Sequence, residues 1–257
     1  MTERLDGRVA VVTGAGEGVG RGIALVLARH GAAVVLGGRT VSKLDSVREE
    51  IAAGGGRAAS VRCDVSVRAD VDALVATTVE TFGPPDILVN NAQGRGNTPT
   101  VDGAALEAVT EEAMLDLFRG GVLASLYGMQ ACFPHMKTRG GTIVNLGSRR
   151  GVEGTPGATP YGTAKEAIRG LTKHAAREWG RYGISVNVIC PAALSTGAAQ
   201  FRDADPERWE KIVASIPLGY MGDPVDDIGP TVVALATDLH YLTGATLMLD
   251  GGMCILR

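Results

Sequence analysis

Tyr161 and Lys165 are the pair of residues best suited to proton transfer. They lie four positions apart in the segment Tyr-Gly-Thr-Ala-Lys, and residues at this spacing share one face of a helix. A nearby ammonium stabilises a phenolate and lowers the pKa of the phenol from about 10, as a general acid or base working near neutral pH requires. Ser148 lies thirteen residues before Tyr161, at the end of an expected strand, where its hydroxyl could bind a substrate oxygen.

A glycine-rich turn lies between the first expected strand and the first expected helix. Glycines let the backbone turn sharply and approach a pyrophosphate, whose charge is held by amides at the helix N-terminus. The turn predicts a dinucleotide site formed by Gly14, Gly16, Glu17, Gly18, Val19 and Gly20.

The end of the second expected strand bears on the choice between NADP and NAD. NAD sites usually place an acid there, whereas an arginine can pair with the 2′-phosphate of NADP. This chain has Gly38 at the acid position and Arg39 after it. Glu17 argues the other way, because a carboxylate in the glycine turn could repel that phosphate. The sequence favours NADP(H), with NAD(H) as the alternative.

These residues are set in a regular alternation of short apolar runs and segments with helical spacing. The apolar runs lack in/out alternation, which is typical of parallel strands covered on both faces. We expect strands at 9–13, 33–36, 59–62, 87–90, 142–146, 186–189 and 246–249. Expected helices span 21–29, 41–52, 68–82, 111–137, 161–179, 206–214 and 225–236. The pattern predicts an α/β fold with a doubly wound parallel sheet of about seven strands and helices on both faces.

A single domain over residues 1–257 is expected, because no linker, charge run or internal repeat divides the chain. Two stretches rich in small or helix-breaking residues, 93–102 and 192–206, are read as loops that follow strands. Ligands in such folds bind beyond the carboxyl ends of the strands. We expect the substrate loops to lie at about 93–110 and 192–220.

Composition excludes several classes of protein. The 257 residues carry 25 basic and 28 acidic side chains, a net charge of −3, with no basic run, so nucleic acid is not an expected partner. No apolar stretch reaches the roughly 18 residues that span a bilayer, and the acidic start is unlike a signal peptide. We expect a cytoplasmic protein that binds no membrane. The four scattered cysteines and four isolated histidines predict neither disulfides nor a metal site.

Taken together, these motifs resemble the short-chain dehydrogenase/reductase family. The resemblance covers nearly the whole chain, and the family's motifs occur in the expected order: the glycine turn, Asp64, Asn90-Asn91-Ala92, Ser148, Tyr161 with Lys165, Asn187, Pro191, Thr196 and Asp250-Gly251-Gly252. It implies a Rossmann-type fold and an NAD(P)(H)-dependent oxidoreductase that interconverts a ketone or aldehyde with an alcohol, a small-molecule substrate. It also implies a homotetramer, or else a homodimer, assembled through the helices at 111–137 and 161–179.

The resemblance further implies a role for each matching residue. Tyr161 would be the general acid or base, Lys165 would bind the nicotinamide ribose and lower the tyrosine pKa, and Ser148 would hold the substrate oxygen. The expected cofactor contacts outside the glycine turn are Arg39, Asp64, Val65, Asn91, Ala92, Tyr161, Lys165, Pro191, Leu194 and Thr196.

The sequence departs from the family pattern at one catalytic position. Members usually carry an asparagine in the long helix before the serine strand, where it helps hold a water of the proton relay; here alignment gives Gly121, or Gly120. Paired glycines in a helix cost about 0.5–1 kcal/mol each, which close packing against a neighbouring subunit could offset. The functional alternatives are a bent helix whose carbonyl holds the water, and extra room for a bulky substrate.

A second departure is Gln93, which stands where the family usually has glycine after Asn-Asn-Ala. We expect activity to survive the loss of the asparagine, because the serine, tyrosine and lysine remain. The alternative is an altered member of the family, either a non-redox enzyme or a dinucleotide-binding protein.

Overall fold

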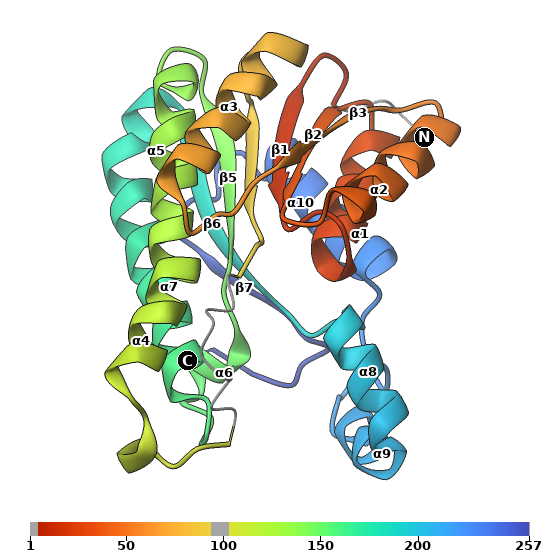
Figure 1. Ribbon diagram of the computed structural model, residues 1–257, viewed down its shortest axis with the longest axis vertical. Helices are drawn as coiled ribbons and strands as arrows, with labels where there is room; N and C mark the ends of the chain where they lie inside the picture. The colour runs from red at the N-terminus through yellow and green to blue at the C-terminus, as the bar shows by residue number, and fades with distance from the viewer. Residues whose placement is uncertain (1–4, 94–102, 257) are drawn as a thin grey trace.

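A parallel β-sheet forms the centre of the protein. The computed structural model describes residues 5–93 and 103–256, and within them seven strands pair in the order β3-β2-β1-β4-β5-β6-β7 (Figure 1). The strands are β1 (Val9–Thr13), β2 (Ala33–Gly38), β3 (Arg57–Arg62), β4 (Ile87–Asn90), β5 (Gly141–Leu146), β6 (Ile184–Pro191) and β7 (Thr246–Leu249). Every paired neighbour runs parallel. The predicted doubly wound sheet is confirmed.

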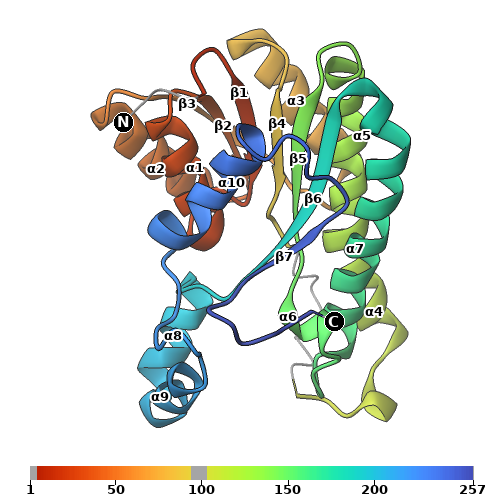
Figure 2. The same ribbon diagram turned by 180° about the vertical axis from the view of Figure 1, so that it is seen from behind.

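Helices cover both faces of this sheet (Figures 1 and 2). One face packs against α1 (Gly18–Arg29), α2 (Val41–Ala53) and α10 (Gly229–Ala236). The opposite face packs against α3 (Arg68–Phe82), α5 (Ala124–Met136) and α7 (Thr159–Trp179). Successive strand residues point to opposite faces, so Ala10 and Val12 join the first core and Val11 joins the second. Burial on both faces explains why the strands are continuous apolar runs.

The remaining helical segments mostly lie beyond the carboxyl ends of the strands. They are η1 (Leu106–Ala108), α4 (Glu111–Leu117), η2 (Phe118–Leu123), α6 (Arg149–Val152), η3 (Gly180–Tyr182), α8 (Thr196–Ala204), α9 (Pro206–Ala214) and η4 (Pro224–Ile228). Figure 2 shows α8 and α9 together on one side of this edge and α4 and α6 on the other. None of the helices in the described ranges is long and apolar enough to cross a membrane.

Two sequence predictions about these segments were wrong. The expected loop at 192–206 contains α8, because Ser195 caps it by accepting a hydrogen bond from the Ala198 N–H and the following residues include good helix formers. The expected continuous helix at 111–137 is interrupted by η2, a π-helical turn that contains Gly120 and Gly121. Residues 94–102 of the other expected loop lie outside the described part of the chain.

The contact between α1 and η4 depends on Gly22. A Cβ atom added at Gly22 would lie 2.5 Å from the carbonyl carbon and the Cβ of Pro224. Real Cβ atoms do not approach other atoms so closely, so any side chain at this position must push η4 away from α1.

We predict that Gly22→Ala lowers the free energy of unfolding by about 1–3 kcal/mol, because overpacking a tight contact strains both elements. Urea unfolding measures the change. Gly54→Ala is the matched control, since its φ is −82° and a Cβ there would meet nothing nearer than 3.5 Å. Equal unfolding midpoints for the two variants would contradict the prediction.

Candidate active site

The glycine turn is held in place by the end of β4. Asn91 Nδ2 donates to Thr13 O at 2.9 Å and to Gly14 O at 3.2 Å. In return, the Thr13 Oγ1 accepts from the backbone N–H groups of Asn91 and Ala92, each at 3.1 Å. These reciprocal bonds fix the turn against the neighbouring strand, with the first N–H groups of α1 left to face a ligand.

Close approach explains two of the glycines. Gly14 has φ +65°, and a Cβ there would lie 2.8 Å from Asn91 Nδ2. A Cβ at Gly20 would lie 2.4 Å from both that nitrogen and Gly14 O. Gly20 is therefore buried beneath the turn and does not line the cavity that the turn borders.

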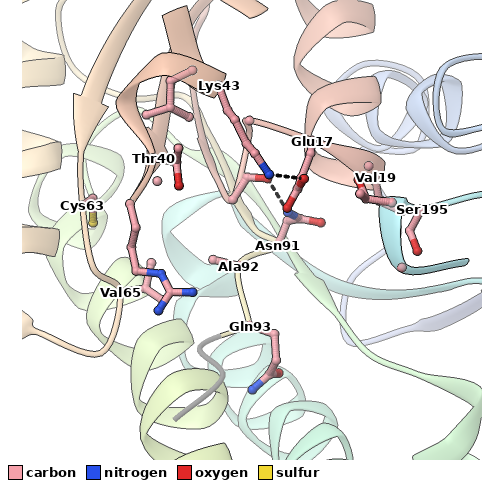
Figure 3. A pocket seen from close by; sticks show the side chains of 18 of the residues that line it. Glu17, Val19, Thr40, Lys43, Cys63, Val65, Asn91, Ala92, Gln93 and Ser195 are labelled. Carbon is pink, nitrogen blue, oxygen red and sulfur yellow. Dashed lines mark hydrogen bonds and ion pairs between the residues drawn. The ribbon is translucent and has the colours of Figure 1, made fainter. Parts of the chain in front are cut away.

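A cavity of about 400 Å³ lies along this turn (Figure 3). Of the predicted cofactor residues, those lining it are Gly14, Gly16, Glu17, Gly18, Val19, Arg39, Asp64, Val65, Asn91, Ala92 and Thr196. Pro191 ends β6 and Leu194 donates its N–H to Gly222 O at 2.8 Å, and neither residue lines the cavity. The structure thus gathers most of the predicted dinucleotide site from five segments of the chain.

The charges around the cavity are arranged in pairs. Glu17 Oε2 accepts from Lys43 Nζ at 2.6 Å (Figure 3), so the ammonium offsets the carboxylate that was expected to oppose a phosphate. Lys43 was not predicted, because only its place on α2 brings it to the glycine turn. On the far side, the Ser66 hydroxyl holds the pKa of the Asp64 carboxyl below its usual range, with a smaller contribution from Arg39.

The shape and chemistry of this cavity fit a dinucleotide. A Cβ atom at Gly16 would lie 2.9 Å from Lys43 Cβ, so this part of the cavity wall has no room for a side chain. The turn also opens onto the N-terminus of α1, whose partial positive charge suits a pyrophosphate. The residues present therefore fit a nicotinamide dinucleotide.

Lys165 lies on α7 and is buried against the end of β5. Its side chain is 3% exposed, and Nζ donates to Leu146 O at 2.8 Å. Burial lowers the pKa of the Lys165 ammonium to about 8, partly opposed by Cys190. The Nζ atom lies 5.5 Å from the centre of the Tyr161 ring, one turn earlier on α7. The Lys165 ammonium therefore lies beside the face of the Tyr161 ring.

Ser148 lies at the N-terminus of α6, directly after β5. The Arg150 N–H donates to Ser148 Oγ at 3.2 Å, which leaves the hydroxyl hydrogen able to donate. The short helix packs tightly on α7, where a Cβ at Gly151 would lie 2.7 Å from Gly162 O. Since Gly162 follows Tyr161, this contact brings the Ser148 segment to the tyrosine. None of Ser148, Tyr161 and Lys165 lines the 400 Å³ cavity.

Buried amides join β4, β5 and α7 between the cavity and these three residues. Asn90 is the last residue of β4 and precedes Asn91. Its Nδ2 donates to Asn145 Oδ1 on β5 at 2.8 Å. Asn145 Nδ2 donates in turn to Thr172 Oγ1 on α7 at 2.9 Å. Sequence reasoning missed Asn145 and Thr172, although two asparagines within apolar strands were a signal that each needs a buried partner.

Comparisons with known proteins agree with this geometry. Residues 14–254 match the family model described as enoyl-(acyl carrier protein) reductase. The chain is 37% identical to a 12α-hydroxysteroid dehydrogenase of a Clostridium species, covering 96% of this chain and 97% of that protein. It is 35% identical to the gluconate 5-dehydrogenase of Gluconobacter oxydans, covering 98% and 96%. A solved structure from Sinorhizobium meliloti 1021, provisionally described as a short-chain alcohol dehydrogenase, shares 34% identity with a TM-score of 0.88 and covers 98% of both chains.

The chain therefore belongs to the short-chain dehydrogenase/reductase family. It is an NAD(P)-dependent oxidoreductase of CH–OH and C=O groups, as the predicted class requires.

We predict that Asn91→Ala weakens NADPH binding about tenfold or more, because two hydrogen bonds that hold the glycine turn are lost, each worth about 0.5–1.5 kcal/mol. Fluorescence titration measures the dissociation constant. Asn187→Ala is the control: Asn187 Nδ2 donates to Leu242 O, another buried structural bond, yet this residue does not line the cavity. The account fails if both variants bind NADPH as the native protein does.

Proposed function

We propose that this protein interconverts a secondary alcohol and a ketone with NADP(H), using Tyr161 as the general acid and base. The observation that carries the proposal is the buried ammonium of Lys165, held by Leu146 O beside the Tyr161 ring. Lysine is rarely fully buried unless it is paired. A cation at this place favours the phenolate form of Tyr161.

Each side chain has a defined part in ketone reduction. A bound nicotinamide would supply the hydride chemistry, which belongs to the cofactor itself. Ser148 Oγ donates a hydrogen bond to the carbonyl oxygen and orients it. Tyr161 gives that oxygen its proton and becomes a phenolate, which the Lys165 ammonium stabilises until solvent returns a proton. Alcohol oxidation reverses these steps.

We predict that Tyr161→Phe lowers kcat by at least about a hundredfold, because general acid–base catalysis contributes roughly 10²–10⁴. NADPH affinity should change little, since the ring and the Lys165 contact with Leu146 O are kept. Tyr127→Phe is the control for loss of a phenol elsewhere. A Tyr161→Phe variant that keeps full turnover would contradict this role, and turnover without net oxidation or reduction of the nicotinamide would indicate the non-redox alternative.

The preference for NADP(H) is supported by the charges at the adenosine end of the cavity. Arg39 and Thr40 line it after β2, where no carboxylate is present to bind a ribose hydroxyl. Glu17 is the residue that argued for NAD(H), and its carboxylate is paired with Lys43. An arginine can form charge-assisted bonds with a 2′-phosphate.

We predict that Arg39→Ala raises the dissociation constant of NADPH by about tenfold or more and leaves that of NADH within about twofold, since a charged hydrogen bond is worth about 1.5–3 kcal/mol. Fluorescence titrations of both cofactors test this. Arg48→Ala is the control, because Arg48 is another exposed arginine nearby, paired with Asp45. Tighter binding of NADH than of NADPH by the native protein would overturn the preference.

Other features of the enzyme stay predictions. The segments at 93–110 and 192–220, the second now including α8 and α9, are proposed to shape the substrate pocket. Residues of α5 and α7 are proposed to form the contacts of a homotetramer or homodimer, and the cytoplasm is the proposed location.

A further inference from the structure

The two departures from the family pattern, Gln93 and Gly121, meet in space. Gly121 is buried in the π-helical turn η2. A Cβ atom added there would lie 2.8 Å from Gln93 Nε2 and 2.9 Å from Gln93 Oε1. The Gln93 carboxamide therefore occupies the space that a side chain at position 121 would need, and the end of Gln93 would have to move to admit one.

The Gln93 carboxamide is only partly hydrogen-bonded. Its Nε2 donates to Leu117 O at a long distance of 3.4 Å. Its Oε1 is buried and has no hydrogen-bond partner among residues 5–93 and 103–256. Buried carbonyl oxygens are nearly always paired, so this atom is an acceptor suited to an O–H donor that enters the site.

The Gly121 backbone cannot take this role. Gly121 O accepts from Ser125 Oγ at 2.9 Å and also from the Ala124 N–H. A carbonyl oxygen has two lone pairs, and both are engaged. The carbonyl of Gly121 itself is therefore not an open acceptor for a water. Gln93 Oε1, whose carboxamide fills the space beside Gly121, has no hydrogen-bond partner in the described part of the chain.

The position of Gln93 connects the cofactor cavity with the proton-transferring residues. Gln93 follows Asn91 and Ala92 and lines the same cavity. Figure 3 shows its side chain directed away from the ion pair of Glu17 and Lys43. The turn η2 that receives the carboxamide packs against α7, the helix of Tyr161 and Lys165.

We propose that Gln93 and Gly121 are a matched pair, in which Gln93 Oε1 accepts a hydrogen bond from a water or a substrate hydroxyl beside α7. Gln93 is thus a positioning residue that supplies, from the end of β4, a polar contact that the Gly121 backbone does not provide. This inference rests on the proposed alcohol and ketone chemistry.

The first test replaces the carboxamide without emptying its space. Gln93→Met has nearly the same length and lacks the amide. We expect native-like NADPH affinity and urea unfolding, with a loss of up to about tenfold in turnover, the value of one hydrogen bond. A lower kcat with a shifted pH profile on every substrate identifies the donor as water. A higher KM confined to substrates with a second hydroxyl identifies it as substrate. Native kcat, KM and pH profile would overturn the proposal.

The second test examines the pairing itself. Gly121→Asn should lose turnover because the new side chain collides with Gln93, and Gln93→Gly/Gly121→Asn should recover at least part of it. Urea unfolding tests the same contact independently of activity. Gly121→Ala should lower the free energy of unfolding more in the native protein than in the Gln93→Gly variant. Equal effects in both backgrounds would overturn the pairing. Failure of the proposed function would be distinct, since the native protein itself would then turn over no alcohol or ketone.

Discussion

The buried hydrogen bond from Lys165 Nζ to Leu146 O is the constraint on which the site depends. It fixes α7 to the end of β5, two residues before Ser148 and one helical turn after Tyr161. This contact between a helix and a strand, together with the packing of Gly151 on Gly162, positions the hydroxyl, the phenol and the ammonium. A buried cation is costly unless it is hydrogen-bonded, and the carbonyl oxygen meets that requirement without cancelling the charge as a carboxylate would.

Asparagine side chains form hydrogen bonds between neighbouring parts of the sheet. Asn91 holds the glycine turn to the end of β4, and its neighbour Asn90 bonds to Asn145 on β5. Asn145 then bonds to Thr172 on α7. Two neighbouring sets of buried polar bonds thus tie the glycine turn to the end of β4, and β4 through β5 to α7. Paired buried amides of this kind are rigid, so β4, β5 and α7 are held in fixed relative positions.

Much of the fold was predictable because strands buried on both faces are written in the sequence as continuous apolar runs, such as Val9–Thr13. The motif residues were predictable from type and spacing, and their expected gathering along one edge follows from parallel topology. The helix α8 was missed because its small residues resemble a loop and its cap, Ser195, has no periodic signal. The ion pair of Glu17 with Lys43 and the contact of Gln93 with Gly121 depend on tertiary packing between segments 26 and 28 residues apart. In the sequence, Gln93 and Gly121 were two unrelated departures from the family pattern. Their contact in the structure shows that they belong together.

The most direct test of this account is the titration of Lys165 in the folded protein without cofactor, followed by NMR of ¹³C-labelled lysine and assigned with Lys165→Met. Burial predicts a pKa of about 8, so the side chain should be a cation at neutral pH and become neutral as the pH rises through that value. In a Cys190→Ser variant, the pKa of Lys165 should stay close to that value, because the Cys190 thiol affects this pKa less than burial does. A pKa near 10.5, the ordinary value of the group, would show that the ammonium lies in water and would contradict the arrangement from which the function is argued.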